Sequence, residues 1–495
     1  MSDDVLREVV GFLSDSDHLR LALTAKLIYT AIPPRPTVVA LAKSSTVLSL
    51  HSALSGSSHT SPGLLRALGI HLPTSTDVKA ARPLLRDIFV QARNLRSLTL
   101  GAAEYADIEL RHSIQAFSSL THLVVHEGRC CSPTTPATTL PRSIRSLHLR
   151  SSANGTPWRL LVRSLSGLPL LETLKLEQCM LEDDDEDDED VDDGDDASDD
   201  NHGDEDENNN SEDSKDSNHQ KAPQSLLHVR TLHALSTPLP TSFAAFANLF
   251  PKVDTMVLED SDLPIEDEDN VDYKSHSLRH VTLSAMATPS SSIPWNVDNL
   301  TLSTTTLDHN IFMDEIYVCF PEGLSGLSLR LPELTGEMWT VVVDNTSRLR
   351  RLELETYAEG IVYLLAMLAD IFDQAADDDY DSTIPQISML SIAALGRHEP
   401  QQFDEVLTRF LGCLPTGLPT LRYVAIAAPP KISMNISDDL AGERAPWRWW
   451  RIIRTDGEAE TREIPAWEGE RVRQFFRGAD EVQANTFEEQ FQALR

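Results

Sequence analysis

The sequence predicts an α/β fold in which a long, curved parallel sheet carries helices on its outer side. Three observations lead to this prediction. The pattern apolar–x–x–apolar–x–apolar occurs thirteen times, most copies start 24 to 30 residues after the previous one, and helical apolar spacing separates them. A unit that recurs at such a period is typical of a solenoid, whose stacked units share one core. The copies start at Leu65, Leu95, Leu120, Ile144, Leu171, Val229, Val253, Leu278, Val297, Leu324, Leu349, Ile387 and Leu421.

Each copy of the pattern predicts one β-strand. In the copy Leu95-Arg-Ser-Leu98-Thr-Leu100, the strand lies around the second and third leucines. Side chains alternate along a strand, so these two leucines point inward and their neighbours point outward. Inward side chains of successive copies then form a continuous core, because a single unit cannot bury its own apolar face.

Helices are predicted between the strands. Apolar residues recur every three or four positions at 158–165, 243–246, 361–368 and 403–407, as in amphipathic helices. Two long steps, of 38 and 34 residues, leave room for the longest helices. Strand followed by helix, repeated, predicts a solenoid over residues 34–430.

An acidic run interrupts the repeats. One step measures 58 residues, and residues 182–220 within it contain 22 acidic residues and one lysine. With almost no apolar side chains, this segment cannot offset the entropy cost of folding, so we predict a disordered insertion in one repeat's loop. Two roles stay open for it: a solvated spacer, or an electrostatic tether for a basic partner.

A different pattern follows the last repeat. Residues 447–453 and 461–464 alternate on either side of Asp456-Gly457, which predicts a β-hairpin, and a short helix is expected around 470–476. We interpret residues 431–495 as a cap over the end of the solenoid, because an open stack needs covered ends. Trp447, Trp449 and Trp450 serve either cap packing, which the pattern favours, or ligand binding.

Residues 1–33 differ from the repeats. Ser2 is a suitable helix N-cap, and apolar side chains at Val5, Val9, Phe12 and Leu13 fall on one helical face. A second helix is expected around Leu19 to Leu27 before Pro33-Pro34 ends the unit. Such short helices have too little apolar surface for a core of their own, so they need a partner or the adjacent repeats.

Composition excludes several classes of function. The chain has a formal net charge of −35 and shows no basic stripe, which argues against nucleic acid as a partner. No run of eighteen apolar residues is present, so we expect no membrane partner. Five cysteines without a CxxC spacing favour free thiols in a reducing compartment, the cytoplasm or the nucleus. Because we find none of the common catalytic or cofactor motifs, we predict neither an enzyme nor a cofactor.

The concave face of the predicted solenoid is the candidate substrate surface. Outward strand positions line this face, and many of them are histidine or basic; a solvated polar face is the alternative for any single residue. His122 and His126 share a strand face but lie about 13 Å apart, too far to bind one metal ion, so no metal site is predicted. The candidates are His122, His126, His148, Arg150, Lys175, His233, His280, Arg330 and Arg351.

Two parts of the chain resemble known families. The copy from Leu171 to Leu181, with Cys179 at the position that caps the turn, resembles a leucine-rich repeat, and copies near Ser261 and Thr305 fit with weaker capping residues. Residues 3–13 and 17–27 resemble the two halves of an F-box. Together they resemble the fungal proteins that place a short helical F-box before a leucine-rich-repeat solenoid.

The resemblance implies a non-catalytic adaptor of a cullin–RING (SCF-type) ubiquitin ligase. The F-box would dock on the linker subunit of the ligase by helix-in-groove recognition, and the repeats would hold an unknown protein substrate. The side chains expected to contact the linker subunit are Val5, Leu6, Val9, Phe12, Leu13, Leu19 and Leu21. The alternative is a repeat scaffold or an acidic, histone-chaperone-like binder of basic proteins, in which residues 1–33 are only a cap.

Overall fold

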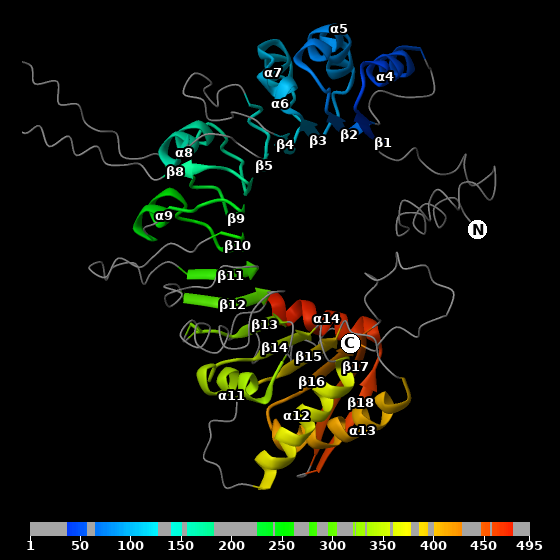
Figure 1. The fold of residues 1–495 in the computed structure, drawn as a ribbon, viewed down its shortest axis with the longest axis vertical. Coiled ribbons are helices and arrows are strands. Elements are labelled where there is room, and N and C mark those ends of the chain that lie inside the picture. The colour runs from blue at the N-terminus through cyan, green and yellow to red at the C-terminus, as the bar shows by residue number, and fades with distance from the viewer. Residues whose placement is uncertain are drawn as a thin grey trace, which may run out of the picture.

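The chain forms one long, mostly parallel sheet that curves into an arc (Figure 1). The computed structural model describes residues 37–56, 65–126, 140–150, 156–182, 225–240, 243–261, 277–284, 296–303, 320–321, 323–331, 334–356, 360–377, 386–394, 400–427, 447–455 and 458–478. The predictions for residues 1–33 and for 183–220 lie outside these residues.

Sixteen strands of the described chain follow one another across the sheet in sequence order. Neighbours from β1 to β16 pair in parallel, and β6 with β8 forms a separate two-stranded sheet. The strands are β1 (Thr37–Leu41), β2 (Leu65–Ile70), β3 (Ser97–Leu100), β4 (His122–His126), β5 (Ser146–Arg150), β6 (Thr156–Pro157), β7 (Thr173–Glu177), β8 (Leu181–Glu182), β9 (Thr231–Leu235), β10 (Thr255–Glu259), β11 (Ser277–Ser284), β12 (Asn296–Ser303), β13 (Gly326–Leu331), β14 (Arg351–Thr356), β15 (Met389–Ala394), β16 (Tyr423–Ala427), β17 (Trp447–Thr455) and β18 (Glu458–Ile464).

Helices lie on the outer, convex side of this arc, except the last, α14 (Figure 1). In the described chain none of them is both long and apolar enough to cross a membrane. The helices are α4 (Ser44–Gly56), α5 (Ser75–Gln91), α6 (Ala102–Ala106), α7 (Ile108–Gln115), α8 (Trp158–Leu165), α9 (Phe243–Leu249), α11 (Gly336–Asn345), α12 (Gly360–Asp377), α13 (Pro400–Gly417) and α14 (Ala466–Gly478).

All thirteen copies of the apolar pattern form strands of the main sheet. Their three apolar positions are buried in every copy, with exposed fractions between 0 and 7%. The register keeps equivalent positions side by side, as in Leu98 with Leu123 and Leu174 with Leu232. Because a shift of one residue would turn these side chains out of the core, the leucines themselves fix the register. The sequence pattern thus correctly predicts the mixed α/β sheet and its strand positions.

The sheet contains one strand that neither the repeats nor the hairpin pattern predicts. β1 pairs in parallel with β2 and adds an N-terminal strand ahead of the first copy. Its Leu41 is buried, whereas Val38 is 75% exposed. One buried leucine in five residues is too weak a signal to separate this strand from a loop by pattern alone.

Three consecutive strands end in the same tight turn. Gln178, Ser236 and Asp260 follow β7, β9 and β10 with φ angles of 54°, 46° and 50°. The next residue of each turn is buried, and hydrogen bonds link the three turns in series. The N–H of Cys179 donates to Thr237 Oγ1, and the N–H of Thr237 donates to Ser261 Oγ. At the predicted capping positions, Ser261 Oγ accepts from a turn N–H, and Cys179 Sγ donates to the carbonyl groups of Leu149 and Glu177.

The C-terminal hairpin closes the end of the sheet. β17 pairs antiparallel with β16 and with β18, which confirms the predicted hairpin. Trp449 and Trp450 are buried, so these two side chains serve packing.

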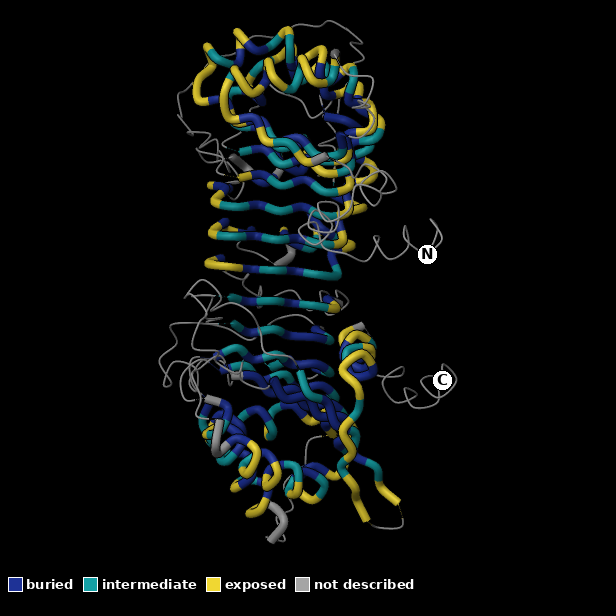
Figure 2. Tube along the Cα trace, turned by 90° about the vertical axis from the view of Figure 1, so that its right-hand side faces the viewer, coloured by how far each residue is buried: buried dark blue, intermediate teal, exposed yellow. Residues whose placement is uncertain are grey.

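Helix α14 lies on the concave face, where Figure 2 shows it beside the last strands. Its Val472 and Phe476 pack with Met389, Tyr423 and Trp449. Met389 and Tyr423 alternate with Leu390 and Val424, which belong to the main core behind the sheet. The helix therefore covers the side of the sheet that faces away from the other helices.

Candidate binding surface on the concave face

The candidate substrate surface predicted from the sequence is the concave face of the sheet, which is turned toward the viewer in Figure 2. Outward side chains form rows across the strands, because the parallel register aligns equivalent positions. Six of the nine candidate residues fall on four neighbouring strands of the sheet, β4, β5, β7 and β9. We call this group the basic patch; it consists of His122, His126, His148, Arg150, Lys175 and His233.

The centre of the basic patch is a row of three side chains. His148 aligns with Lys175, and Lys175 aligns with His233, so three neighbouring strands each place one ring or ammonium group in line. All three residues are half-buried. Neighbouring strands lie about 4.8 Å apart, so the row spans about 10 Å.

Glu177 is the carboxylate of this region, and two side chains of the patch bind it. His148 Nε2 lies 2.9 Å from Glu177 Oε2, and Arg150 Nε lies 2.8 Å from Oε1. Two side chains of β5 therefore bind both carboxylate oxygens. Among the described residues, no carboxylate pairs with Lys175.

Burial and a nearby charge lower the pKa of both histidines in the row. Burial lowers the pKa of His148, and the charge of Lys175 lowers it further, although Glu177 acts in the opposite direction. Burial and then Lys175 also lower the pKa of His233. Both imidazoles are therefore neutral at pH 7, and the permanent charge at the centre of the patch belongs to Lys175.

One edge of the patch contains a contact that the sequence analysis missed. The rings of His71 and His126 meet edge to face with centroids 4.7 Å apart, although β3 lies between their strands. The intervening position is Gly101, where a Cβ atom would lie 3.5 Å from His71 Nδ1. No local pattern marks His71, because it follows its strand instead of lying in it.

Glu104 lies beneath this edge. Its side chain is fully buried, and its Oε1 accepts a 2.5 Å hydrogen bond from the N–H of Leu72. Burial raises the pKa of Glu104, although backbone N–H groups oppose that shift. The carboxyl group joins the first turn of α6 to the end of β2.

The other three candidates lie apart from the basic patch. Arg330 on β13 pairs with Glu355 on β14 at 2.8 Å. Burial, followed by the charge of Arg351, lowers the pKa of His280 on β11. Arg351 lies on the concave side in register with Met389, but it is only 4% exposed, so it is not open to a substrate as predicted.

Arg351 instead joins two strands and the C-terminal helix. Its Nη2 donates to Asn299 Oδ1 at 3.0 Å, across the glycine position of β13, and its Nη1 pairs with Glu353 at 2.8 Å. Glu353 also binds Arg477 of α14 at 2.7 Å. Burial by itself would raise the pKa of Glu353, but Arg477 and Arg351 hold it below its usual value. This network has a structural role, because it holds α14 against the sheet.

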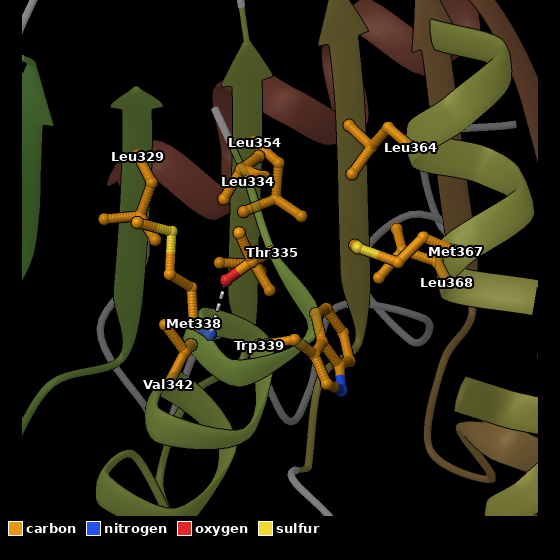
Figure 3. A pocket seen from close by; sticks show the side chains of 11 residues that line it. Leu329, Leu334, Thr335, Met338, Trp339, Val342, Leu354, Leu364, Met367 and Leu368 are labelled. Carbon is orange, nitrogen blue, oxygen red and sulfur yellow. Dashed lines mark hydrogen bonds between the residues drawn. The ribbon is translucent and has the colours of Figure 1, made fainter. Parts of the chain in front are cut away.

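The described residues contain no group of three or more His, Cys, Asp or Glu side chains able to hold a metal ion. Figure 3 shows an apolar space between β13, β14, α11 and α12, lined by residues such as Leu329, Trp339 and Leu364. Its volume is about 10 Å³, room for at most one water molecule. This space is too small to hold a ligand.

No family model matches the chain, and no curated protein matches it.

Proposed function

We propose that this protein is the substrate-recognition adaptor of a cullin–RING ubiquitin ligase. Residues 1–33 dock on the linker subunit as an F-box, and the leucine-rich-repeat-like solenoid holds a protein substrate on its concave face. Ubiquitin transfer belongs to the partner subunits, so this chain needs no catalytic group of its own.

The gathering of six candidate side chains on the concave face supports the substrate-binding half of the proposal. A curved sheet of sixteen strands presents an extended surface suited to a protein ligand. The strands carry their leucines into the core, which leaves the alternate positions available for contacts. The small cavity behind the sheet is unsuited to a small substrate.

The sequence of residues 3–27 supports the docking half of the proposal. Val5, Leu6, Val9, Phe12 and Leu13 lie on one side of the expected first helix. An apolar stripe of this kind is what helix-in-groove recognition requires.

A co-purification experiment with the purified linker subunit tests the docking half. The full chain should retain the linker subunit, and Leu6→Asp and Phe12→Asp should abolish binding because each places a charge in an apolar interface. Leu48→Asp is the matched control, because Leu48 is 55% exposed on α4. Equal binding by all four proteins, or no binding by the unmodified chain, would refute the proposal.

A second candidate function rests on the acidic run. Residues 182–220 contribute a net charge of −21, enough to attract basic nuclear proteins as a histone-chaperone-like scaffold does. Deleting 183–220 separates the two functions. The adaptor should keep the linker subunit after the deletion, whereas the scaffold should lose its basic partners and never bind the linker subunit.

A further inference from the structure

Lys175 is a half-buried cation that faces the concave side without an acidic partner among the described residues. Glu177 lies two positions further along the same strand, and Arg150 and His148 bind its two oxygens. A partly dehydrated ammonium group gains strongly from a charged acceptor, because the surrounding protein screens the interaction less than water does.

Further hydrogen-bond donors surround this lysine. His233 is its neighbour on β9, and Thr173 and Thr231 align with each other two positions earlier on the same two strands. These four residues form a rectangle of about 4.8 Å by 6.7 Å on the sheet face. An ammonium group, an imidazole N–H and two hydroxyl groups can all donate to one bound oxyanion.

The charge balance selects the type of anion. With Glu177 compensated by Arg150 and His233 neutral, the rectangle carries one net positive charge at pH 7. A carboxylate carries one negative charge and has two acceptor oxygens, which matches one ammonium group and one imidazole N–H. A phosphate group carries close to two negative charges, and half of that would be left uncompensated.

We propose that Lys175 and His233, flanked by Thr173 and Thr231, bind an aspartate or glutamate side chain of an extended acidic peptide. This deepens the proposed function, on which it rests, by naming the class of segment that the substrate presents. The concave sheet supplies the surface along which such a peptide lies, and Lys175 supplies the charge that orients it.

The test measures fluorescence anisotropy of three labelled Gly-Ser peptides that differ at three central positions: Asp, Asn or phosphoserine. The full chain should bind the Asp peptide at pH 7.5 and at low salt at least about tenfold more tightly than the Asn peptide. Lys175→Met should weaken that binding about tenfold, and Lys175→Arg should restore most of it. Lys79→Met on the convex helix α5 is the matched control and should bind as the unmodified chain does.

Several results would overturn the proposal: no binding of the Asp peptide, equal binding of Asp and Asn peptides, or equal affinities for the Lys175→Met and Lys79→Met proteins. Tighter binding of the phosphoserine peptide than of the Asp peptide would overturn the choice of a carboxylate. Binding of the linker subunit is measured on the same preparations. The peptide site and the ligase docking can therefore fail independently, and the recovery of binding by Lys175→Arg shows that a loss in Lys175→Met is due to the missing charge.

Discussion

Replacing Gly326 by alanine should break the buried contact that joins β12 to β14. Gly326 belongs to β13, the strand between them, and its missing side chain leaves the space in which Arg351 reaches Asn299. A Cβ atom at this position would overlap Asn299 Oδ1 and lie 2.7 and 2.9 Å from Arg351 Nη2 and Nε. Both side chains are buried, so neither can move aside while keeping the hydrogen bond.

The expected cost follows from the contacts that are lost. A hydrogen bond to a charged group contributes about 1.5–3 kcal/mol, and overpacking a tight site costs about 1–3 kcal/mol. The unfolded chain has less conformational entropy with alanine than with glycine, which offsets about 0.4–1 kcal/mol of this cost. We therefore expect a net local destabilisation of about 3 kcal/mol for Gly326→Ala.

Hydrogen exchange measured by mass spectrometry reports this cost locally, which suits a repeat protein whose units open separately. Amides of β12 to β14 should exchange about a hundredfold faster in Gly326→Ala than in the unmodified chain. Gly69→Ala is the matched strand control, because the atoms nearest to its Cβ would be 3.9 Å away. The reasoning is wrong if both substitutions change hydrogen exchange equally. It is also wrong if Gly326→Ala destabilises a protein that already carries Asn299→Ala as much as it destabilises the unmodified chain.

Two further predictions concern single residues. Because folding raises the pKa of Glu104, the folded protein binds its proton more tightly, and this carboxyl group lowers stability as the pH rises above about 4.5. Glu104→Gln should therefore raise the melting temperature more at pH 8 than at pH 5; a pH-independent difference would contradict this. Gln178 has a φ of 54° at the end of β7, so Gln178→Gly should stabilise the protein by about 0.5–1 kcal/mol in urea unfolding, and Gln178→Ala should not.

Much of the candidate surface can be predicted from the sequence, because strand alternation is a local property. Once Leu147, Leu174 and Leu232 are assigned to the core, the residues after them must face the other way. The row of His148, Lys175 and His233 then follows from the register. The pattern cannot show which of these side chains are paired, and it therefore treated the buried Arg351 like the half-buried Lys175.

The sequence by itself determined the strands of the thirteen copies, their register and the side of the sheet on which their residues lie, since alternation and a repeated apolar pattern act over a few residues. Only the tertiary structure decided that His71 reaches His126, that Arg351 bonds Asn299 and that α14 turns back onto the concave face. Arg351 and Asn299 are 52 positions apart in the sequence, and Arg477 of α14 is 124 positions from its partner Glu353. These contacts depend on how the strands stack in space, and no short stretch of sequence carries that information.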